Sequence, residues 1–444
     1  MDIKQTSKKS SLSRRTFIGR SASIAAGVAA LHAGPAIAQS AESANEKLGI
    51  GLIGCGGRGM GHLGTWRWLA HNGGNVEMVA VCDVYRPRMD RAAQQAGEVK
   101  QYMDYRELIA DPNVDIVSIA TPDHHHAQQA IDAMLAGKDV FCEKPLTHWD
   151  QFELAKEFAR VARETQRVFL LGTQGMSDPA WWQMKALVDE GLIGQPLHAE
   201  CGYFRVGDWG ERGMGIDDPE ATPGHNLDWD AFLGDRPRRD FDVSRFFRWR
   251  MYEDYAGGPS TDLYPHSFTP VTTAFDLKAP AYAVGTGGIY RYPLEITQQE
   301  NPNEQIEREV PDTFNMLVDY PEGITCAVLG TQGNAHQGTG YRGAPGRVPV
   351  LRGWEGTLTL EGNEIVFDAS NTSSREAARY PVEGGENMGE FLRKFVECVR
   401  AGDPETQSPA ERAYHTQVAL SMGYLSLREG KTVRFDADRE ELVM

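Results

Sequence analysis

The feature that most constrains the fold is a glycine-rich turn that directly follows an apolar run. Residues 48–53 read Leu-Gly-Ile-Gly-Leu-Ile, which predicts a buried β-strand. The turn reads Gly54-Cys55-Gly56-Gly57-Arg58-Gly59, and a helical pattern continues to Ala70. Glycines at this spacing allow a tight turn, a close approach of a pyrophosphate and helix–strand packing. The pattern predicts a dinucleotide held at a helix N-terminus, with contacts from Gly54, Gly56, Gly57, Arg58 and Gly59.

A second apolar run, residues 76–82, predicts the next strand and ends at Asp83. An acid at this place, 24 residues after Gly59, accepts hydrogen bonds from the hydroxyls of the adenine ribose. Because its charge repels a 2′-phosphate, we expect NAD(H), with NADP(H) disfavoured. Arg86 and Arg88 follow closely and soften that preference.

Strand and helix patterns alternate through the rest of this region. We expect helices over 105–110, 126–135 and 150–165, and strands over 115–120, 139–142 and 168–171. Such alternation predicts a doubly wound parallel sheet, a Rossmann domain, over residues 48–172. Ligands of such sheets lie at the carboxyl ends of the strands, where Gly54, Asp83, Thr121 and Lys144 fall.

Two distant motifs carry a family resemblance. The first comprises Ala120-Thr121-Pro122 with His126, Gly137-Lys138 and Cys142-Glu143-Lys144-Pro145-Leu146. The second is Gly257-Gly258 followed by Asp262 and His266, in the order Asp-x-x-x-His. Over residues 48–430 the chain resembles the glucose–fructose oxidoreductase/inositol dehydrogenase (Gfo/Idh/MocA) family.

The resemblance implies an α/β chain whose second, α+β domain (173–444) contains a large, open, mostly antiparallel sheet. Strand patterns over 197–205, 281–286, 315–320, 324–330, 356–361 and 363–368 agree, as do helical patterns over 388–401 and 410–427. Residues 331–348 are polar and glycine-rich and are expected to form a loop. We assign substrate binding and oligomerisation to this domain and expect a homo-oligomer, a dimer or a tetramer.

The resemblance implies that Lys144, Asp262 and His266 form the catalytic constellation. Oxidation of a carbinol needs a base for the hydroxyl proton, and histidine suits this near neutral pH. Asp262 orients the ring or binds a neighbouring hydroxyl, and Lys144 stabilises developing alkoxide charge. The lysine is expected to precede a cis peptide bond at Pro145.

Further residues are expected around the cofactor and the substrate. Thr121, Pro122, His126 and Glu143 join Lys144 at the cofactor, with Glu143 as a structural contact. The run His124-His125-His126 does not predict a metal site, because adjacent residues point in different directions. An aromatic and basic stretch is typical of sugar sites, although core and salt-bridge roles fit it equally; its substrate candidates are Arg248, Trp249, Arg250, Tyr252 and Tyr264.

The first 38 residues predict an export signal. Basic residues and Ser13-Arg14-Arg15-Thr16-Phe17-Ile18 precede a short apolar stretch and Ala36-Ile37-Ala38, which is typical of a cleavage site. The paired arginines resemble a twin-arginine signal, read by the twin-arginine export machinery. We expect cleavage near Ala38, a linker over 39–47 and a periplasmic protein. That route carries proteins that are already folded and, as a rule, already contain their cofactor, so we expect tightly bound NAD(H).

Composition excludes several partners. A formal net charge of −17 argues against nucleic acid and anionic lipid, and the apolar stretch of the signal is too short for stable membrane insertion. The six cysteines contain no CxxC pair, so we expect buried free thiols and no metal.

Three hypotheses of different classes follow. The first is an exported oxidoreductase that acts on a CH–OH group of a sugar or polyol. The second is a glycosidase that uses transient oxidation by NAD; Tyr264-Pro265-His266 resembles a stretch of the NAD-dependent glycosidases, with the histidine one position early. The third is a binding module without turnover, which the intact motifs disfavour.

Overall fold

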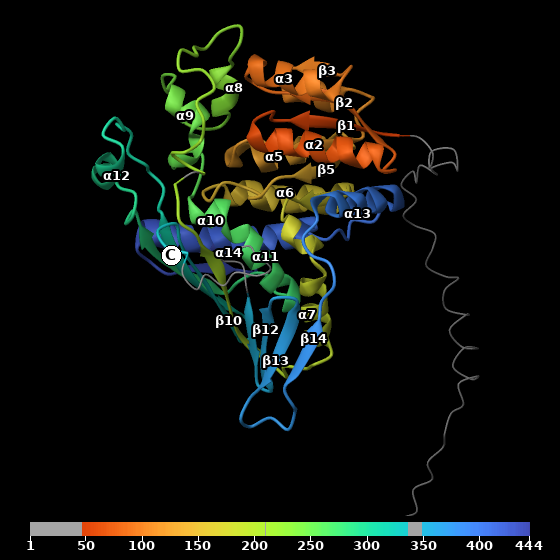
Figure 1. The fold of residues 1–444 in the computed structure, drawn as a ribbon, viewed down its shortest axis with the longest axis vertical. Helices are drawn as coiled ribbons and strands as arrows, with labels where there is room; N and C mark the ends of the chain where they lie inside the picture. Colours follow the sequence, from red (N-terminus) through yellow and green to blue (C-terminus); the bar gives the residue numbers. More distant parts are fainter. Residues whose placement is uncertain (1–46, 209, 336–348) are drawn as a thin grey trace, which may run out of the picture. The chain divides into compact units, whose positions relative to one another are not determined.

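The computed structural model describes residues 47–208, 210–335 and 349–444. The predicted signal (1–38), all of the predicted linker (39–47) except Lys47, and residues 336–348 of the predicted loop lie outside this range. Two sheets organise the described part of the chain, and each carries one of the domains expected from the sequence (Figure 1).

The first sheet has, within the described residues, six parallel strands in the order β3-β2-β1-β4-β5-β6. This is the order of a doubly wound dinucleotide-binding sheet, and it reverses between β1 and β4. The central strands are apolar on both faces because helices cover both sides of the sheet, whereas the edge strand β3 is polar. The strands are β1 (Leu48–Ile53), β2 (Val76–Cys82), β3 (Lys100–Tyr102), β4 (Ile116–Ile119), β5 (Asp139–Cys142) and β6 (Phe169–Leu171).

Helices connect these strands and cover the sheet. They are α2 (Gly57–His71), α3 (Arg86–Ala96), α4 (Tyr105–Ala110), the 3-10 helix η2 (Asp123–His125), α5 (His126–Leu135) and α6 (Phe152–Thr165). The Lys144–Pro145 peptide bond that follows β5 is cis, as the family resemblance implies.

The second sheet has ten strands within the described residues, in the order β14-β13-β12-β11-β7-β10-β9-β8-β15-β16. Only the β7–β10 pair is parallel, so the sheet is mostly antiparallel, as expected. The strands are β7 (Pro196–Phe204), β8 (Tyr282–Gly288), β9 (Thr313–Tyr320), β10 (Ile324–Thr331), β11 (Val350–Gly353), β12 (Gly356–Glu361), β13 (Glu364–Ala369), β14 (Ala378–Pro381), β15 (Val433–Asp436) and β16 (Glu441–Val443).

Helices pack on one face of this sheet. Helix α11 (Tyr264–Ala274) packs on β7, and helix α14 (Ala410–Glu429) packs on β8 and β9. The other helices of the domain are η3 (Gln174–Ser177), α7 (Pro179–Asp189), α8 (Trp229–Leu233), α9 (Val243–Phe247), η4 (Trp249–Met251), α10 (Pro259–Asp262), α12 (Leu294–Glu300) and α13 (Met388–Ala401). On the opposite face, the paired residues Val284 and Leu317 are 42% and 59% exposed.

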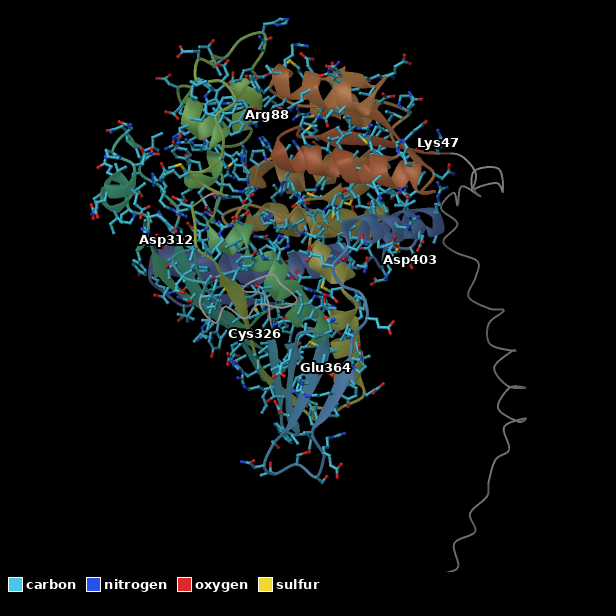
Figure 2. The ribbon with its side chains drawn as sticks, in the orientation of Figure 1. Lys47, Arg88, Asp312, Cys326, Glu364 and Asp403 are labelled. Carbon is cyan, nitrogen blue, oxygen red and sulfur yellow. The ribbon has the colours of Figure 1, made fainter. Side chains whose placement is uncertain are left out.

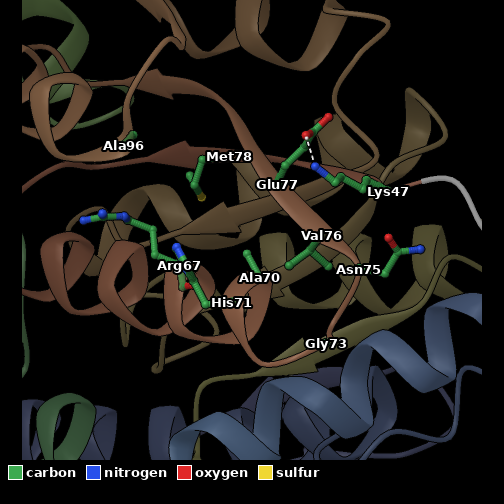
Figure 3. Close-up of a pocket in the computed structure, with 10 residues that line it drawn as sticks. All are labelled: Lys47, Arg67, Ala70, His71, Gly73, Asn75, Val76, Glu77, Met78 and Ala96. Carbon is green, nitrogen blue, oxygen red and sulfur yellow. Dashed lines mark hydrogen bonds and ion pairs between the residues drawn. The ribbon is translucent and has the colours of Figure 1, made fainter.

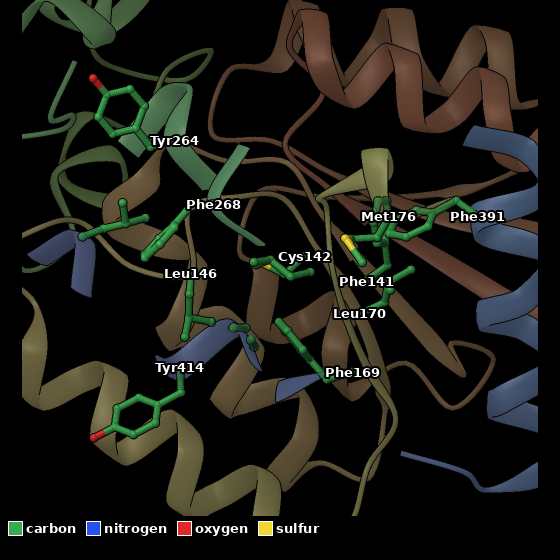
Figure 4. Packing of buried hydrophobic residues seen from close by; sticks show 14 of the residues in the cluster. Phe141, Cys142, Leu146, Phe169, Leu170, Met176, Tyr264, Phe268, Phe391 and Tyr414 are labelled. Carbon is green, nitrogen blue, oxygen red and sulfur yellow. The ribbon is translucent and has the colours of Figure 1, made fainter. Parts of the chain in front are cut away.

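One apolar core runs through both domains. It joins Phe141 and Phe169 of the first sheet to Phe391 of α13, Tyr414 of α14 and Phe268 of α11 (Figure 4). Because this core is shared, it fixes the first sheet against α10 and α11, which carry Asp262 and His266.

A second, smaller core belongs to the segment 214–256, which we call the aromatic segment. Its buried side chains include Trp229, Phe232, Phe246 and Phe247, and Tyr85 of the loop after β2 packs among them. The aromatic segment therefore rests on the carboxyl edge of the first sheet.

All six cysteines are free thiols, and all but Cys398 are buried. Residues 47–208, 210–335 and 349–444 contain no cluster of three or more metal-ligating side chains. Over the same ranges, no helix is long and apolar enough to cross a membrane.

Candidate functional site

The glycine-rich turn has the geometry of a phosphate-binding loop. Gly54 has a φ of +88°, and a Cβ there would lie 2.7 Å from the carbonyl carbon of Ala120. A Cβ on Gly59 would lie 1.8 Å from the carbonyl oxygen of Gly54. Only glycine fits at these two positions, because a side chain on Gly54 would collide with the backbone after β4 and one on Gly59 would separate α2 from the turn.

The other two glycines face open space at the start of α2. A Cβ on Gly57 would meet nothing within 4 Å, and one on Gly56 would meet only the guanidinium of Arg88. The 15-residue helix begins without a side-chain cap and without an acidic residue in its first turn. Its N–H groups and dipole suit an anion, so the turn fits the pyrophosphate of a dinucleotide.

Asp83 lies beside this turn, directly after β2. Its Oδ2 accepts the N–H of Cys55 at 2.6 Å, and its Oδ1 accepts the N–H of Tyr85 at 2.8 Å. Burial raises its pKa above the ordinary value. A carboxylate has lone pairs left after two hydrogen bonds, so Asp83 can still accept from ribose hydroxyls.

Residues after β4 are tied to the end of β5. The ring nitrogens of His126 lie 2.6 Å from the carbonyl oxygen of Pro145 and 2.8 Å from that of Thr121, and the residue is 1% exposed. Thr121 donates its hydroxyl to Gln129, and Pro122 precedes η2. His126 therefore holds two strand ends together, and its ring is already engaged by the backbone.

Glu143 closes a buried contact, as expected. Its Oε1 accepts hydrogen bonds from Arg58 at 2.6 Å and from His62 at 3.0 Å. The other ring nitrogen of His62 lies 3.0 Å from the Ser118 hydroxyl. Burial raises the pKa of Glu143, but the charge of Arg58 and the His62 bond outweigh it and hold that pKa well below the ordinary range. Arg58 and Glu143 thus fasten α2 to the end of β5.

The structure brings Lys144 and Asp262 into direct contact. The Lys144 ammonium donates to the backbone oxygen of Asp262 at 2.6 Å and to its Oδ1 at 3.0 Å. Arg250 Nε lies 3.3 Å from the same Oδ1, and an Arg205 nitrogen lies 4.0 Å from Oδ2. Burial raises the pKa of Asp262, but the charges of Lys144, Arg250 and Arg205 outweigh it and hold the pKa far below the ordinary value.

His266 lies one helical turn after Asp262. Asp262 ends α10, Leu263 separates the two helices, and His266 is in the first turn of α11 with a half-buried side chain. Asp262 and His266 therefore lie on two successive helices, with the break at Leu263 between them.

The substrate candidates divide into two groups. Trp249, Tyr252 and Tyr264 are 7%, 5% and 0% exposed, and the Tyr264 hydroxyl donates to the backbone oxygen of Phe314. Their burial favours the core role that the sequence left open for this stretch over a role as stacking surfaces for a sugar. Arg248 and Arg250 remain partly exposed, and only Arg250 reaches the Lys144–Asp262 pair.

A buried ionic network behind Asp262 was not predicted. Arg205 Nη2 lies 3.1 Å from both carboxylate oxygens of Glu211, and Gln332 donates to Glu211 at 2.6 Å. Arg308, which is fully buried, donates to Asp208 and Gln332 at 2.8 and 3.0 Å. These residues come from distant segments that share no motif. The sequence offered only one weak signal for the network, a charged residue, Arg205, at the end of a predicted strand.

Asp123 is a second buried acid near this site for which the sequence predicted no role. It follows Thr121-Pro122 and is 4% exposed. Burial raises its pKa, while His126, Arg250 and Lys144 lower it less strongly. Its position directly after the Thr-Pro motif was the available signal.

A pocket of about 720 Å³ lies elsewhere, at the amino ends of β1 and β2. Lys47, Arg67, His71 and Glu77 are among its lining residues (Figure 3). Ligands of parallel sheets bind at the carboxyl ends, so this pocket is separate from the site described above.

The fold and the site define a two-domain, dinucleotide-binding α/β protein, and family comparisons agree. Residues 48–173 match the model of an oxidoreductase family with an NAD-binding Rossmann fold, and residues 179–281 match the C-terminal alpha/beta domain of the same family. Together the matches cover slightly more than half of the chain. The chain belongs to the Gfo/Idh/MocA oxidoreductase family.

Curated relatives match over about a third of this chain. Inositol 2-dehydrogenase of Salmonella typhimurium is 39% identical over 164 residues, which is 36% of this chain and 46% of that protein. Alpha-N-acetylgalactosaminidase of Shewanella oneidensis is 31% identical over 173 residues, 37% of this chain and 36% of that protein. The chain thus spans less than half the length of these two relatives.

Solved structures match across both domains. A levoglucosan dehydrogenase in complex with NADH and levoglucosan has 19% identity and a TM-score of 0.65, covering 88% of this chain and 99% of that one. An NAD-binding oxidoreductase from Klebsiella pneumoniae has 22% identity and a TM-score of 0.64, covering 87% and 98%. At these identities the likeness establishes the two-domain fold.

Proposed function

We propose that the protein is an oxidoreductase that uses NAD(H) to oxidise or reduce a CH–OH group of a sugar or polyol. The observation that carries the proposal is the contact of Lys144 with Asp262 at the carboxyl edge of the sheet that bears the glycine turn and Asp83. The names of the curated relatives, most of them inositol dehydrogenases, support a polyol or sugar substrate.

When bound, NAD(H) supplies a hydride acceptor or donor. In the oxidation direction, His266 takes the hydroxyl proton of the substrate as the carbonyl forms, because an imidazole is the ordinary base near neutral pH. The Lys144 ammonium donates a hydrogen bond to the same oxygen and offsets its developing negative charge. In the reverse direction His266 returns the proton.

Asp262 acts as a positioning residue for Lys144. Three cations hold its pKa so low that it stays ionised and takes no proton at neutral pH. Its carboxylate and backbone oxygens fix the ammonium at 3.0 and 2.6 Å. This assigns proton transfer to His266 and charge stabilisation to Lys144.

The test is turnover in Lys144→Ala and His266→Ala. Each substitution should reduce turnover at least about a hundredfold, the usual scale for a general base or a charge-stabilising donor. Both variants should still bind the dinucleotide, measured by quenching of protein fluorescence. Lys185→Ala is the matched control, because Lys185 pairs with Asp189 on the surface of α7. Near-normal turnover in either site variant removes that residue from the mechanism.

A glycosidase is the second candidate. It is favoured by the 31% identity to an alpha-N-acetylgalactosaminidase and by Tyr264-Pro265-His266. In such a reaction bound NAD⁺ would supply a transient hydride acceptor. The carbinol would lose a hydride and its hydroxyl proton, the proton of the neighbouring carbon and the aglycone would leave, water would add to the resulting double bond, and the hydride and a proton would return to the carbonyl. Release of a chromogenic aglycone without net formation of NADH supports this candidate over the first.

Export and cofactor retention form one proposal that rests on residues 1–38. A protein exported in folded form takes its dinucleotide from the cytoplasm, and the periplasm has no useful pool to replace it. We therefore expect near-stoichiometric NAD(H) after gel filtration of the protein exported by its native cell, with turnover that needs no added dinucleotide. Replacing Arg14 and Arg15 together by lysine should leave an uncleaved, cytoplasmic chain. Export of that variant, or an empty native protein, contradicts the proposal.

A homo-oligomer, dimer or tetramer, is proposed from the exposed sheet face. Val284 and Leu317 pair across β8 and β9 and are largely exposed. Light scattering should give a dimer or larger mass that falls in Leu317→Glu. A monomeric native protein contradicts this proposal.

A further inference from the structure

The loop that follows β2 in the first domain is held by hydrogen bonds from the second domain. The N–H of Asp228 donates to the backbone oxygen of Val84 at 2.9 Å, and the N–H of Arg86 donates to that of Asn226 at 2.9 Å. The ring of Tyr85 packs edge-on against Phe246 and Phe247. The aromatic segment therefore packs against the loop that follows Asp83, the acid expected to bind the adenine ribose.

An ion pair also joins the aromatic segment to α3 of the first domain. Arg88 Nε lies 2.7 Å from Asp217 Oδ2, and the two side chains are 16% and 32% exposed. The guanidinium also lies over the ring of Phe247, 5.1 Å from its centroid. Figure 2 shows Arg88 where the part of the chain that carries α8 and α9 meets the first domain.

The same guanidinium lies at the dinucleotide site. It is the group that a Cβ on Gly56 would meet first, at 3.4 Å. Its charge lowers the pKa of Asp83, while that of Asp217 raises it, so both side chains act on the ribose-binding acid. Arg86, the other arginine of the loop, lies with Nη2 3.2 Å from the sulfur of Met103.

We propose that Asp217, a residue of the second domain, determines the choice of NAD(H) over NADP(H) by holding Arg88. A 2′-phosphate is recognised by charge-assisted hydrogen bonds, for which a guanidinium fork is the best donor. Asp217 occupies Arg88 and adds a second carboxylate beside Asp83. The inference rests on the proposed NAD-dependent function.

Asp217→Asn tests the inference, since it removes the charge and keeps the shape. The ratio of the dissociation constants for NADPH and NADH is measured by fluorescence quenching, and in protein purified with bound dinucleotide the released species is identified. The ratio should fall at least about tenfold in Asp217→Asn, while the affinity for NADH changes less than threefold. Asp217→Glu, which keeps the charge, should retain the native preference.

Two further variants show that the effect passes through Arg88. Arg88→Met combined with Asp217→Asn should lose the gain in NADPH affinity, because the Arg88 guanidinium that would bind the 2′-phosphate has been removed. Asp230→Asn breaks an exposed ion pair with Arg238 in the same segment and should leave the ratio unchanged.

The outcomes separate this inference from the proposed function. An unchanged ratio in Asp217→Asn overturns the inference alone. Equal changes in the affinities for NADH and NADPH also overturn it, because the Arg88–Asp217 pair would then act on the pyrophosphate that both dinucleotides contain. A native protein that binds neither dinucleotide overturns the proposed function and the inference together.

Discussion

Asp262→Asn is the substitution that tests most directly whether Asp262 compensates the cations around it. The Asp262 side chain is 15% exposed, and Lys144 and Arg250 nitrogens lie 3.0 and 3.3 Å from its Oδ1. At an effective dielectric constant near 20, a unit pair at 3 Å attracts by roughly 5 kcal/mol. Desolvation offsets much of this attraction in the intact cluster. Removing one partner leaves uncompensated cations, which costs about 3–5 kcal/mol.

The assay is urea unfolding followed by fluorescence, with turnover measured on the same preparations. We expect the free energy of unfolding to fall by about 3–5 kcal/mol. Lys144→Met combined with Asp262→Asn should show a coupling of roughly 1–3 kcal/mol, since the two groups share one contact. Asp189→Asn, which breaks an exposed pair with Lys185 on α7, should show no resolvable loss. A loss below about 1 kcal/mol in Asp262→Asn, with no coupling, would refute the argument that Asp262 compensates buried cations.

Two further predictions concern the turn and the interface between the domains. Gly59→Ala should reduce dinucleotide affinity at least about tenfold and destabilise the fold by about 1–3 kcal/mol, because its Cβ would lie 1.8 Å from the Gly54 oxygen. Gly61→Ala in the same helix, with nothing within 4 Å, should be neutral or stabilising, and a tolerated Gly59→Ala would contradict the packing argument. Burial lowers the pKa of His125 from 6.5 to about 4, and its Nε2 lies 2.7 Å from the Phe232 oxygen. Because the unfolded chain takes up the proton first, the contribution of His125 to stability should be complete above about pH 6.5 and should fall by roughly 3 kcal/mol as the pH drops to 4. Urea unfolding across this pH range should show a smaller fall in the free energy of unfolding for His125→Gln than for the native protein. An identical pH profile would exclude His125 as a cause of the acid destabilisation.

Much of the fold could be predicted because its strands and helices carry local signals. The run at Leu48–Ile53 has no polar side chain, the run at Val76–Cys82 has only one, Glu77, and the Met388–Ala401 helix has a clear amphipathic period. Their predicted bounds match the structure. The glycine turn, Asp83 and Lys144 could be placed at one sheet edge because parallel strands put their carboxyl ends together.

Elements without such signals were missed. Strand β3 is short and polar at the sheet edge, and β15 and β16 are held by pairing with β8 and with each other. Helix α11 contains Pro270, which argues against a helix from sequence alone. These elements exist because the surrounding sheet and core supply the pairing and burial that their own residues do not specify.

The sequence by itself determined the α/β fold with its parallel dinucleotide-binding sheet and the glycine turn, because these are written in residues that are close together along the chain. The catalytic roles of Lys144, Asp262 and His266 stay predictions that the family resemblance implies. The tertiary structure alone decided that Asp262 is surrounded by Lys144, Arg250 and Arg205, and that Asp217 holds Arg88. It also turned Trp249, Tyr252 and Tyr264 into core residues. Burial and charge pairing depend on which distant segments meet, and that is settled by the packing of the whole core.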